Sequence, residues 1–597
     1  MDGRNRASQN VGCGARSFML LVAVFALGLT LPRTSETQEA PGPTQPHPPE
    51  LTAPRVSIAW NRLYDEPEVS EILRRLHQEY PDRTRLEAIG TSEEGRSLWV
   101  LVVTGAGAAS DRERPAMWVD GNVHGNEVQA AETCLYLAWY LLENSNRVPA
   151  ITELLNRVSF YILPMVNPDG RAYWFRAPNT DSSSRSGKRP TDNDGDGVCD
   201  EDGYDDLDGD GEILQMRKRD PLGRWRASPE DARLLVRAKP DERGEWTLLG
   251  SEGIDNDGDG RVNEDGPGGY DMNRNWPSLW MPNYVQFGAG EYPFSFPETR
   301  AVGDFILDHP NIAAVQSFHN AGGMILRGPG AESFGEYPPA DVRVYDELGK
   351  TGESLLPFYR YMVLWKDLYT VYGGFVTWTY EGLGIFSLTN ELWTEKRRAA
   401  RTQDLSPKER LDFNDLLRSG VDYRDWRPAT HPVYGEIEIG GWRKAAGRTP
   451  PSFLIEEELH RNALFCIYHA GQMPELAFEE VTVTPLPTGQ HQIDVTITNR
   501  RPIPSISAMA RSNRIGLPDR LELLGKGVEI RFAATVEDRF PERLAPIATE
   551  LHRILNRAGV ERTQPYQVRY LVSGRGKVEL TYHSQKAATI RHEVVLE

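Results

Sequence analysis

The stretch DGNVHGNEVQAAE, residues 120–132, constrains the fold of this chain more than any other. It follows a short apolar segment, residues 116–119, and leads into residues 127–144, whose apolar side chains share one helical face. It therefore predicts a buried strand, a tight turn and a helix. Within the turn, His124 and Glu127 are three residues apart, a spacing that a metal ion could require.

Strands and helices alternate on both sides of this stretch. Residues 68–81, EVSEILRRLHQEYP, have helical spacing, whereas residues 97–105, SLWVLVVTG, and residues 158–163, VSFYIL, have the composition of buried strands. Such alternation is typical of an α/β fold. We therefore predict a mixed, mostly parallel sheet that is flanked by helices.

The last part of the chain has a different pattern. From about Leu476, polar and apolar residues alternate with a period of two, as in HQIDVTITN, residues 491–499, and YQVRYLV, residues 566–572. This period is typical of half-buried antiparallel strands. It predicts an all-β sandwich domain over residues 475–597.

The N-terminus resembles a secretory signal peptide. Arg4, Arg6 and Arg16 precede the apolar run FMLLVAVFALGLTL, residues 18–31, and a Pro-rich stretch follows. We predict a signal peptide over residues 1–34 and a Pro-rich linker over residues 35–55. The run is short for a membrane span, so an uncleaved anchor is the less favoured alternative. The protein is expected to be secreted or periplasmic, with no stable membrane insertion after cleavage.

The charge of the chain restricts its partners. The formal net charge is −19, and eleven acidic side chains with no basic one lie between Asp192 and Glu212. Because nucleic-acid binding needs a basic face, nucleic acid is excluded as an expected partner.

An acidic insert, at about residues 180–268, contains an internal repeat. DNDGDGVCDEDG, residues 192–203, and DNDGDGRVNEDG, residues 255–266, share nine of their twelve letters. Each begins with alternating Asp residues and a Gly, as calcium loops do, although the twelfth position is Gly instead of Glu. The candidate calcium ligands are Asp192, Asp194, Asp196, Asp255, Asp257 and Asp259. The alternative is a solvated acidic loop without calcium. A bound calcium could also order part of a neighbouring active site.

Further polar motifs follow in a fixed order. They are IGTSEEGRSLWVLVVTG (89–105), MVNPDG (165–170), DMNRNWP (271–277), SFHNAGG (317–323) and FSLTNELW (386–393). Together with the H-x-x-E of residues 124–127, they resemble the zinc metallocarboxypeptidases of the carboxypeptidase A type. The resemblance spans roughly Ile58 to Gln472. It implies a carboxypeptidase-like catalytic domain over residues 56–474, with one catalytic zinc ion and, from the acidic loops, structural calcium.

The resemblance implies a role for each matching polar residue. His124, Glu127 and His319 would be the zinc ligands. Glu391 of TNELW would be the general base, and a glutamate in such an apolar context is costly to bury without a role. Asn273 and Arg274 of NRN would bind the terminal carboxylate of the substrate, since a guanidinium suits bidentate carboxylate recognition.

Two assignments stay open between neighbouring candidates. The substrate-capping tyrosine falls on Tyr369, with Tyr372 as its rival. The arginine that stabilises the oxyanion is assigned to Arg217 of LQMRKRDP, with Arg176 of YWFR as the alternative.

The specificity of the enzyme can also be anticipated from the resemblance. Asn126 stands where many family members have an Arg, so one substrate contact is expected to be absent. Val376 and Thr377 fall at positions that line the specificity pocket, and neither is acidic. A neutral or apolar C-terminal residue is therefore expected over Lys or Arg.

The leading hypothesis is a secreted zinc metallocarboxypeptidase that acts on peptides or proteins with a free C-terminus. One alternative is a zinc amidase or deacylase that acts on peptidoglycan peptides or N-acyl amino acids. Another is a catalytically inert, calcium-stabilised binding module. The intact NRN motif and a capping tyrosine favour the peptidase over the amidase, and the intact zinc ligands and Glu391 argue against the inert module.

Overall fold

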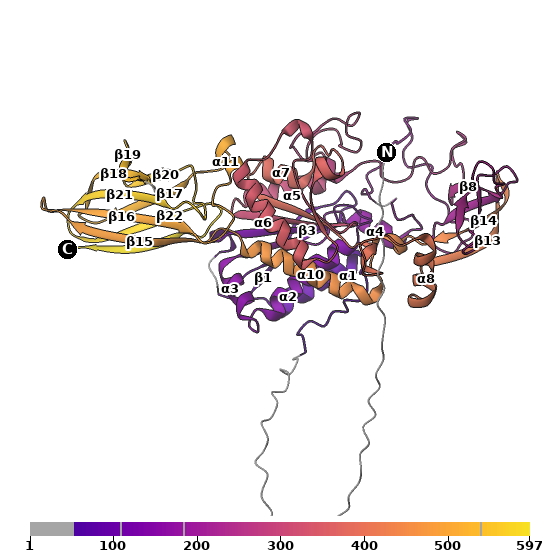
Figure 1. Ribbon diagram of the computed structural model, residues 1–597, viewed down its shortest axis with the longest axis horizontal. Coiled ribbons are helices and arrows are strands. Elements are labelled where there is room, and N and C mark those ends of the chain that lie inside the picture. The colour runs from indigo at the N-terminus through magenta and orange to yellow at the C-terminus, as the bar shows by residue number, and fades with distance from the viewer. Residues whose placement is uncertain (1–52, 108–109, 183–184, 538–539) are drawn as a thin grey trace, which may run out of the picture. The chain divides into compact units, whose positions relative to one another are not determined.

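A computed structural model of the chain describes residues 53–107, 110–182, 185–537 and 540–597 (Figure 1). The predicted signal peptide, residues 1–34, and most of the predicted linker, residues 35–55, lie outside the described residues. Export therefore stays a prediction. In the described ranges, no helix is both long enough and apolar enough to cross a bilayer.

An eight-stranded mixed sheet forms the centre of the α/β region. Its strands, in spatial order, are β1 (Thr84–Thr91), β2 (Ser97–Val103), β4 (Ser159–Leu163), β3 (Ala116–Gly121), β9 (Ile312–Asn320), β12 (Phe386–Leu392), β10 (Met324–Arg327) and β11 (Arg360–Val363). Four of the seven neighbouring pairs are parallel, and the others are antiparallel. The prediction of a mixed, mostly parallel sheet is confirmed.

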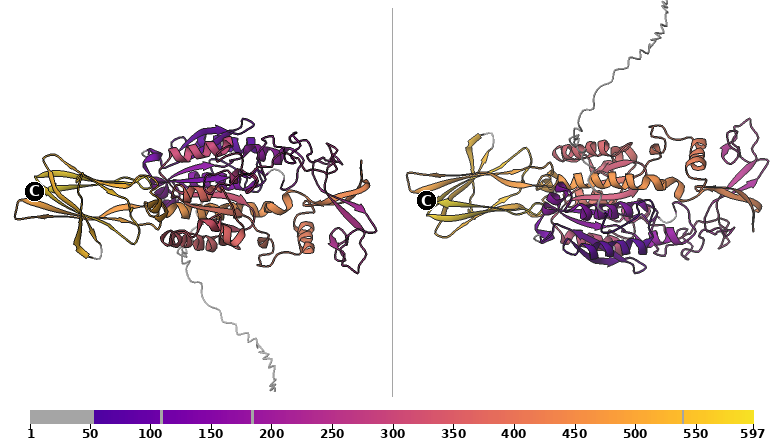
Figure 2. Two further views of the ribbon diagram at one scale, coloured as in Figure 1. Left: turned by 90° about the horizontal axis from the view of Figure 1, so that it is seen from above. Right: turned by 90° about the horizontal axis from the view of Figure 1, so that it is seen from below.

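Helices cover both faces of this sheet (Figure 2). They are α1 (Glu66–Glu79), α2 (Gln129–Asn144), α3 (Pro149–Arg157), α4 (Pro168–Arg176), α5 (Pro297–Asp308), α6 (Pro339–Leu355), α7 (Phe375–Glu381) and α10 (Ser452–Gly471). In β3, Met117 and Val119 pack in the cluster of α1, α2, α6 and α10. Ala116 and Trp118 pack in the cluster of α5 and α7. Successive strand residues face opposite ways, so a strand covered on both faces must be apolar throughout.

Local sequence signals fix where the helices begin. At the start of α1, the Asp65 side chain accepts a hydrogen bond from the backbone N–H of Glu68 at 3.1 Å. The Glu68 side chain in turn accepts from the backbone N–H of Asp65 at 3.0 Å. This capping box satisfies two N–H groups that have no partner within the helix. The apolar face of α1 is then buried, with Val69, Leu73 and Leu76 in the core.

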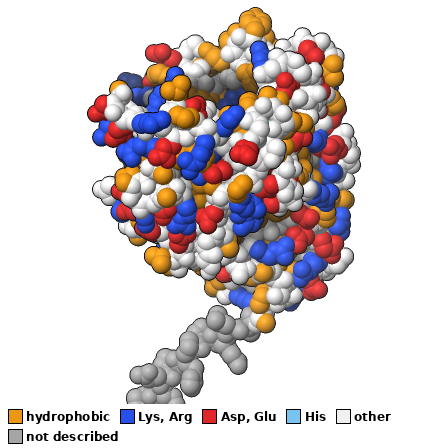
Figure 3. All heavy atoms as spheres, turned by 90° about the vertical axis from the view of Figure 1, so that its right-hand side faces the viewer, with side chains coloured by type: hydrophobic (Ala, Val, Ile, Leu, Met, Phe, Trp, Pro, Cys, Tyr) orange, Lys and Arg blue, Asp and Glu red, His pale blue; other side chains and the backbone are white. Residues whose placement is uncertain are grey.

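The acidic insert forms most of a second, six-stranded sheet, which the sequence patterns do not predict. In spatial order, its strands are β13 (Tyr423–His431), β14 (Gly435–Trp442), β5 (Gln215–Arg219), β8 (Trp246–Ser251), β6 (Trp225–Ala227) and β7 (Leu235–Arg237). The short helices α8 (Pro407–Leu417) and α9 (Ala445–Arg448) flank β13 and β14 along the chain. Figure 3 shows basic and acidic side chains interspersed on the face that includes this sheet. The negative net charge is therefore not gathered there.

The C-terminal part is built from two antiparallel sheets around one core. The first sheet contains β15 (Leu476–Pro485), β16 (Gln490–Asn499), β21 (Tyr566–Ser573), β18 (Glu529–Glu537) and β19 (Phe540–Pro546). The second contains β20 (Arg553–Asn556), β17 (Asp519–Gly525), β22 (Gly576–His583) and β23 (Ile590–Leu596). Side chains from both sheets, including Val495, Tyr570 and Leu580, share one apolar cluster. The predicted all-β sandwich is confirmed, whereas its domain boundaries stay predictions.

Candidate active site

The turn after β3 positions two of the three candidate zinc ligands. Asn122 adopts a left-handed backbone conformation with φ 56°, which Asn tolerates better than most residues. Its Nδ2 donates to the carbonyls of His124 at 2.7 Å and Gly125 at 3.2 Å. At Gly121, a Cβ would lie 2.8 Å from the carbonyl oxygen of Ala130, so only glycine fits. The left-handed backbone at Asn122 and the close approach of Gly121 to α2 together allow the tight turn between β3 and α2.

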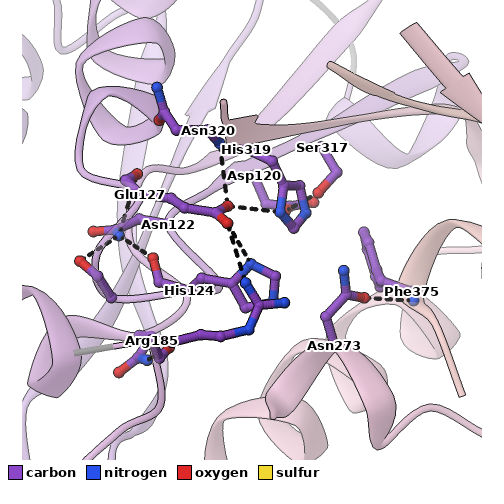
Figure 4. A network of polar contacts seen from close by, with 12 residues as sticks. Asp120, Asn122, His124, Glu127, Arg185, Asn273, Ser317, His319, Asn320 and Phe375 are labelled. Atoms are coloured by element: carbon purple, nitrogen blue, oxygen red, sulfur yellow. Dashed lines mark hydrogen bonds and ion pairs between the residues drawn. The ribbon is translucent and has the colours of Figure 1, made fainter. Parts of the chain in front are cut away.

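The third candidate ligand lies at the end of the neighbouring strand. His319 belongs to β9, which pairs in parallel with β3. Nδ1 of His319 lies 2.8 Å from Glu127 Oε2, and Nδ1 of His124 lies 2.8 Å from Glu127 Oε1 (Figure 4). The three side chains are buried, and their ligand atoms all lie within 4.8 Å of one another. Two imidazole nitrogens and one carboxylate form a donor set that suits a catalytic zinc ion.

Asp271 orients the first of these histidines. Its Oδ1 lies 3.1 Å from Nε2 of His124, the nitrogen that faces away from Glu127. Burial alone would raise the pKa of Asp271, but Arg274, Arg185 and His124 outweigh it and hold the pKa well below its usual range. Asp271 is thus a carboxylate that fixes the imidazole ring, as partners of metal-bound histidines commonly do.

Glu391 lies beside His319 on the next strand. β12 pairs in parallel with β9, and Glu391 is directly opposite His319 in that register. Its Oε2 is shielded from solvent and has no hydrogen-bond partner in the described structure. Burial, together with the charge of Glu127, raises the pKa of Glu391 to about 7. A carboxylate with this pKa and a free oxygen is suited to accept and release a proton near neutral pH.

The two residues of the predicted carboxylate clamp face the same cavity. Asn273 and Arg274 belong to the short 3-10 helix η2 (Met272–Arg274). Oδ1 of Asn273 accepts from the backbone N–H of Phe375 at 2.9 Å, and Nη1 of Arg274 donates to the carbonyl of Asn273 at 2.9 Å. The cavity has a volume of about 280 Å³ and also includes His124, Glu127, His319 and Glu391.

The structure separates the two candidates for the capping tyrosine. Tyr369 follows the π-helical turn η4 (Leu364–Leu368), is 58% exposed and lines the cavity. Among the described residues that line this cavity, Tyr372 is absent, and its backbone N–H donates to Gln286 Oε1 at 3.2 Å instead. The placement therefore favours Tyr369.

The structure corrects the expectation that Arg217 lies at the active site. Arg217 is in β5 of the second sheet, where its guanidinium lies 3.9 Å from the ring centre of Trp246 and 4.1 Å from that of Trp426. Its Nε donates to Glu438 Oε2 at 2.7 Å. These contacts occupy Arg217 within the insert sheet. The rival, Arg176, ends α4 and is likewise absent from the described lining of the cavity.

Arg185 takes the place that was expected for Arg217. Its Nε and Nη2 donate to Asp271 Oδ2 at 3.0 and 2.9 Å, and its Nη1 lies 3.4 Å from Glu127 Oε1 (Figure 4). Arg185 could not be found from the motifs, because it lies in the polar stretch DSSSRSGKR, residues 181–189, which belongs to none of them. The available signal was a cluster of bases, Arg185, Lys188 and Arg189, that follows the NPDG turn and precedes the acidic repeat.

The acidic repeats form a paired structure outside the zinc site. In each loop the first Asp accepts from two glycine N–H groups: Asp192 accepts from Gly195 and Gly197, and Asp255 accepts in the same way. The loops are tied to each other, because Asp265 accepts from Asp200 N–H at 3.1 Å and Asp202 accepts from Asn263 N–H at 3.0 Å. Three acidic clusters result: Asp194 with Asp257, Asp259 and Glu264; Asp192 with Asp194 and Asp265; and Asp194 with Asp196 and Glu201.

Comparisons with known proteins agree with this geometry. A family model described as zinc carboxypeptidase matches residues 69–212 and 237–413. A second model, described as a domain of unknown function, matches residues 475–595.

Carboxypeptidase D of Homo sapiens is 35% identical over 133 residues, which are 22% of this chain and 9% of that protein. Carboxypeptidase A1 of Sus scrofa is 23% identical over 340 residues, which are 54% of this chain and 61% of that protein. The chain thus spans less than two thirds of the length of either relative. The crystal structure of carboxypeptidase A from Helicoverpa armigera aligns with a TM-score of 0.38 at 20% identity, covering 56% of this chain and 66% of that chain.

The zinc carboxypeptidase model covers more than half of the chain and includes the three candidate zinc ligands, the NRN clamp and Glu391. The chain therefore belongs to the zinc carboxypeptidase family.

Proposed function

We propose that this protein is a zinc-dependent carboxypeptidase, which hydrolyses the last peptide bond of peptides that have a free C-terminal carboxylate. One observation carries the proposal. A single cavity of about 280 Å³ contains a zinc-type ligand set, a buried carboxylate beside it and an asparagine–arginine pair suited to bind a carboxylate.

The donor set fits zinc, because two imidazole nitrogens and a carboxylate converge in a buried position and leave the cavity side open. His124, Glu127 and His319 would hold the ion, and Asp271 would keep the His124 ring oriented. A zinc ion bound there would supply Lewis acidity toward the scissile carbonyl and lower the pKa of an attacking water.

Recognition of the chain end falls to Arg274 and Asn273. The guanidinium of Arg274 is buried at the cavity wall, where a carboxylate partner would be partly removed from water. Charge-assisted bonds are stronger in such a place than at the surface. Binding the terminal carboxylate there would place the last peptide bond, and no other, beside Glu391 and the zinc ligands.

Glu391 and Arg185 would share the chemical step. Glu391 takes a proton from the attacking water onto its free oxygen and later gives it to the leaving amine. The guanidinium of Arg185 lies beside the zinc ligands, 3.4 Å from Glu127 Oε1. Its positive charge would stabilise the negative oxygen that develops on the scissile carbonyl. Tyr369, which is exposed at the rim, would close over the bound substrate.

A preference for neutral or apolar C-terminal residues is part of the proposal. The cavity wall near the clamp includes Met324, Leu326, Leu364 and Val376. Thr377 is buried and its hydroxyl donates to the carbonyl of Gly374 at 2.8 Å, so it is not available to the pocket. The only carboxylates in the described lining are Glu127 and Glu391, both of which have other roles.

We expect peptides that end in Phe, Leu or Ala to be hydrolysed at least about tenfold more efficiently than peptides that end in Lys or Arg. A buried cation without a carboxylate partner would lose about 1.4 kcal/mol or more of binding free energy. The measurement is kcat/KM on N-blocked peptides that differ only in their last residue. Faster release of Lys or Arg would contradict this specificity, and cleavage of amidated peptides would favour the amidase alternative.

We also propose that the acidic loops bind structural calcium. Besides the clustered Asp side chains, Glu201 and Glu264 each have both carboxylate oxygens shielded from solvent without a hydrogen-bond partner in the described structure. Oxygen ligands of this kind are what calcium prefers, and without a cation they would repel one another.

Calcium added to calcium-free, zinc-loaded protein is expected to raise Tm, because binding to the folded state alone stabilises it by about 2.7 kcal/mol at a hundred times Kd. The double variant Asp194→Asn, Asp257→Asn should lose this shift, whereas the exposed Asp82→Asn should keep it. Tm by differential scanning calorimetry, with magnesium as the comparison ion, decides the matter. An equal shift with both ions, or none with calcium, would count against the proposal.

A further inference from the structure

A second and larger cavity lies beside the six-stranded sheet that contains the insert strands. It has a volume of about 690 Å³, within the range of ligand-binding pockets, which is roughly 300–1,000 Å³. Aromatic side chains from the insert and from β13 and β14 line it, including Trp225, Tyr423, Trp426 and Trp442. We call it the insert groove. None of the roles assigned above uses it.

At two places, residues that are close in sequence line the insert groove and the zinc-site cavity. Asp181 lines the groove, and Arg185, four residues later, lines the zinc-site cavity. At the second place, Gly447 of α9 lines the groove, and the adjacent Arg448 lines the zinc-site cavity. At α9, two adjacent residues therefore line one cavity each, so the two cavities are close neighbours there.

A side chain of the H-x-x-E motif contacts the edge of the insert groove. Asn126, which stands between His124 and Glu127, donates from Nδ2 to the carbonyl of Asp181 at 2.8 Å. On the other side, Nη1 of Arg448 donates to the carbonyl of Asn320, the residue after His319, at 3.3 Å. The rim of the groove is thus fastened to residues beside the zinc ligands.

The position of the clamp gives the direction in which a substrate would extend. Figure 4 shows Asn273 and Phe375 on one side of His124, and Asn122 and Glu127 on the other. A peptide whose terminal carboxylate is held by the clamp has its remaining residues on the opposite side of the scissile bond. Asp181, at the edge of the groove, is held by Asn126, which stands between His124 and Glu127 in the chain.

The basic side chains that line the groove already have partners. The lining includes four bases, Arg233, Arg410, Arg443 and Lys444, and two acids, Asp181 and Glu230. The arginines are paired with carboxylates, as Arg443 is with Glu212. The ammonium of Lys444 donates to the carbonyls of Trp174 and Ala177 and to the side chain of Asn179. Recognition in the groove therefore falls to its aromatic and aliphatic side chains.

We propose that the insert groove binds the residues that precede the scissile bond in a long peptide substrate, and that it favours aromatic and aliphatic side chains over polar ones. The inference rests on the proposed carboxypeptidase activity and adds a selection for peptide length and upstream sequence. The aromatic rings of the groove supply a large apolar contact area for such side chains.

Gly447 allows the groove to be blocked with little risk to the fold. A Cβ at this position would have no atom within 4 Å. Gly447→Trp therefore adds a large side chain to the groove without a backbone clash. Gly471→Trp is the matched control, since Gly471 ends α10, also meets open space and does not line the groove in the described structure. Tm of each variant verifies that it is folded.

The test compares kcat/KM for an N-blocked dipeptide and for octapeptides with the same two last residues, carrying either Phe or Ser upstream. We expect the wild type to prefer the Phe octapeptide to the dipeptide by about tenfold, equivalent to about 1.4 kcal/mol. Gly447→Trp should lose most of this gain, and Gly471→Trp should keep it.

Absence of a gain with length, or a gain that Gly447→Trp leaves intact, would overturn the groove assignment while the carboxypeptidase proposal stands. A stronger gain with Ser than with Phe would overturn the preference for apolar side chains. Hydrolysis of neither the dipeptide nor the octapeptides by the zinc-loaded protein would overturn the proposed function, and the groove inference with it.

Discussion

Glu391→Gln is expected to lower kcat by about 10²- to 10⁴-fold, the range that general acid–base catalysis contributes. The amide of Gln has nearly the shape of the carboxylate but cannot take a proton from water. KM should change little, because the clamp residues Asn273 and Arg274 are untouched. The measurement is steady-state kinetics on a peptide with an apolar C-terminal residue.

Two comparisons make this result specific. Zinc content should stay at one ion per chain in Glu391→Gln, which separates loss of the base from loss of the metal. Glu298→Gln is the matched control, because burial also raises the pKa of Glu298 to about 7 but this residue is absent from the described lining of the cavity. Equal losses in both variants would indicate damage to the fold and would contradict the role given to Glu391.

Arg274→Ala is expected to lower kcat/KM on free-acid peptides by about 10²- to 10³-fold, as when one member of a buried charge pair is removed. The ratio of kcat/KM on free-acid peptides to kcat/KM on amidated peptides should also fall, since only a free terminal carboxylate would bind the Arg274 guanidinium. Arg274→Lys should recover only part of the loss, because an ammonium lacks the planar fork.

Arg217→Ala serves as the comparison for this second variant. It removes a buried arginine from the insert sheet, where Arg217 lies between Trp246 and Trp426. Lower Tm with an unchanged preference for free-acid peptides is the expected result. If instead Arg217→Ala abolished turnover while Arg274→Ala did not change the preference, the clamp assignment would be wrong.

The α/β sheet could be predicted because each strand and helix carries its own periodic pattern. The same is true of the sandwich, where alternate residues of β16 are buried as a period of two requires. The insert sheet could not be predicted in this way. β5 contains QMRKR, a sequence with weak alternation, and it becomes a strand by pairing with β14, which lies far later in the chain.

The residues of the candidate site likewise differ in how well the sequence predicts them. His124, Glu127, His319 and Glu391 stand at strand ends in recognisable motifs, and the structure brings them together. Arg185 lies in an irregular polar segment, and its partner Asp271 stands on the other side of the whole insert. A contact that closes such a long loop leaves no local pattern in the sequence. The position of Arg185 therefore depends on tertiary contacts with Glu127 and Asp271.

The parallel pairing of β9 with β12 has a consequence for how this protein tolerates insertions and deletions. His319 and Glu391 are opposite each other on adjacent strands, whose separation of about 4.8 Å is a property of every sheet. The backbone pairing of the two strands, and not a surface loop, therefore sets the distance between these two residues. Loops around the site can lengthen, shorten or acquire whole modules while the base and the metal ligand keep their distance. A one-residue slip in strand register would separate the two side chains, because it would turn one of them to the opposite face of the sheet.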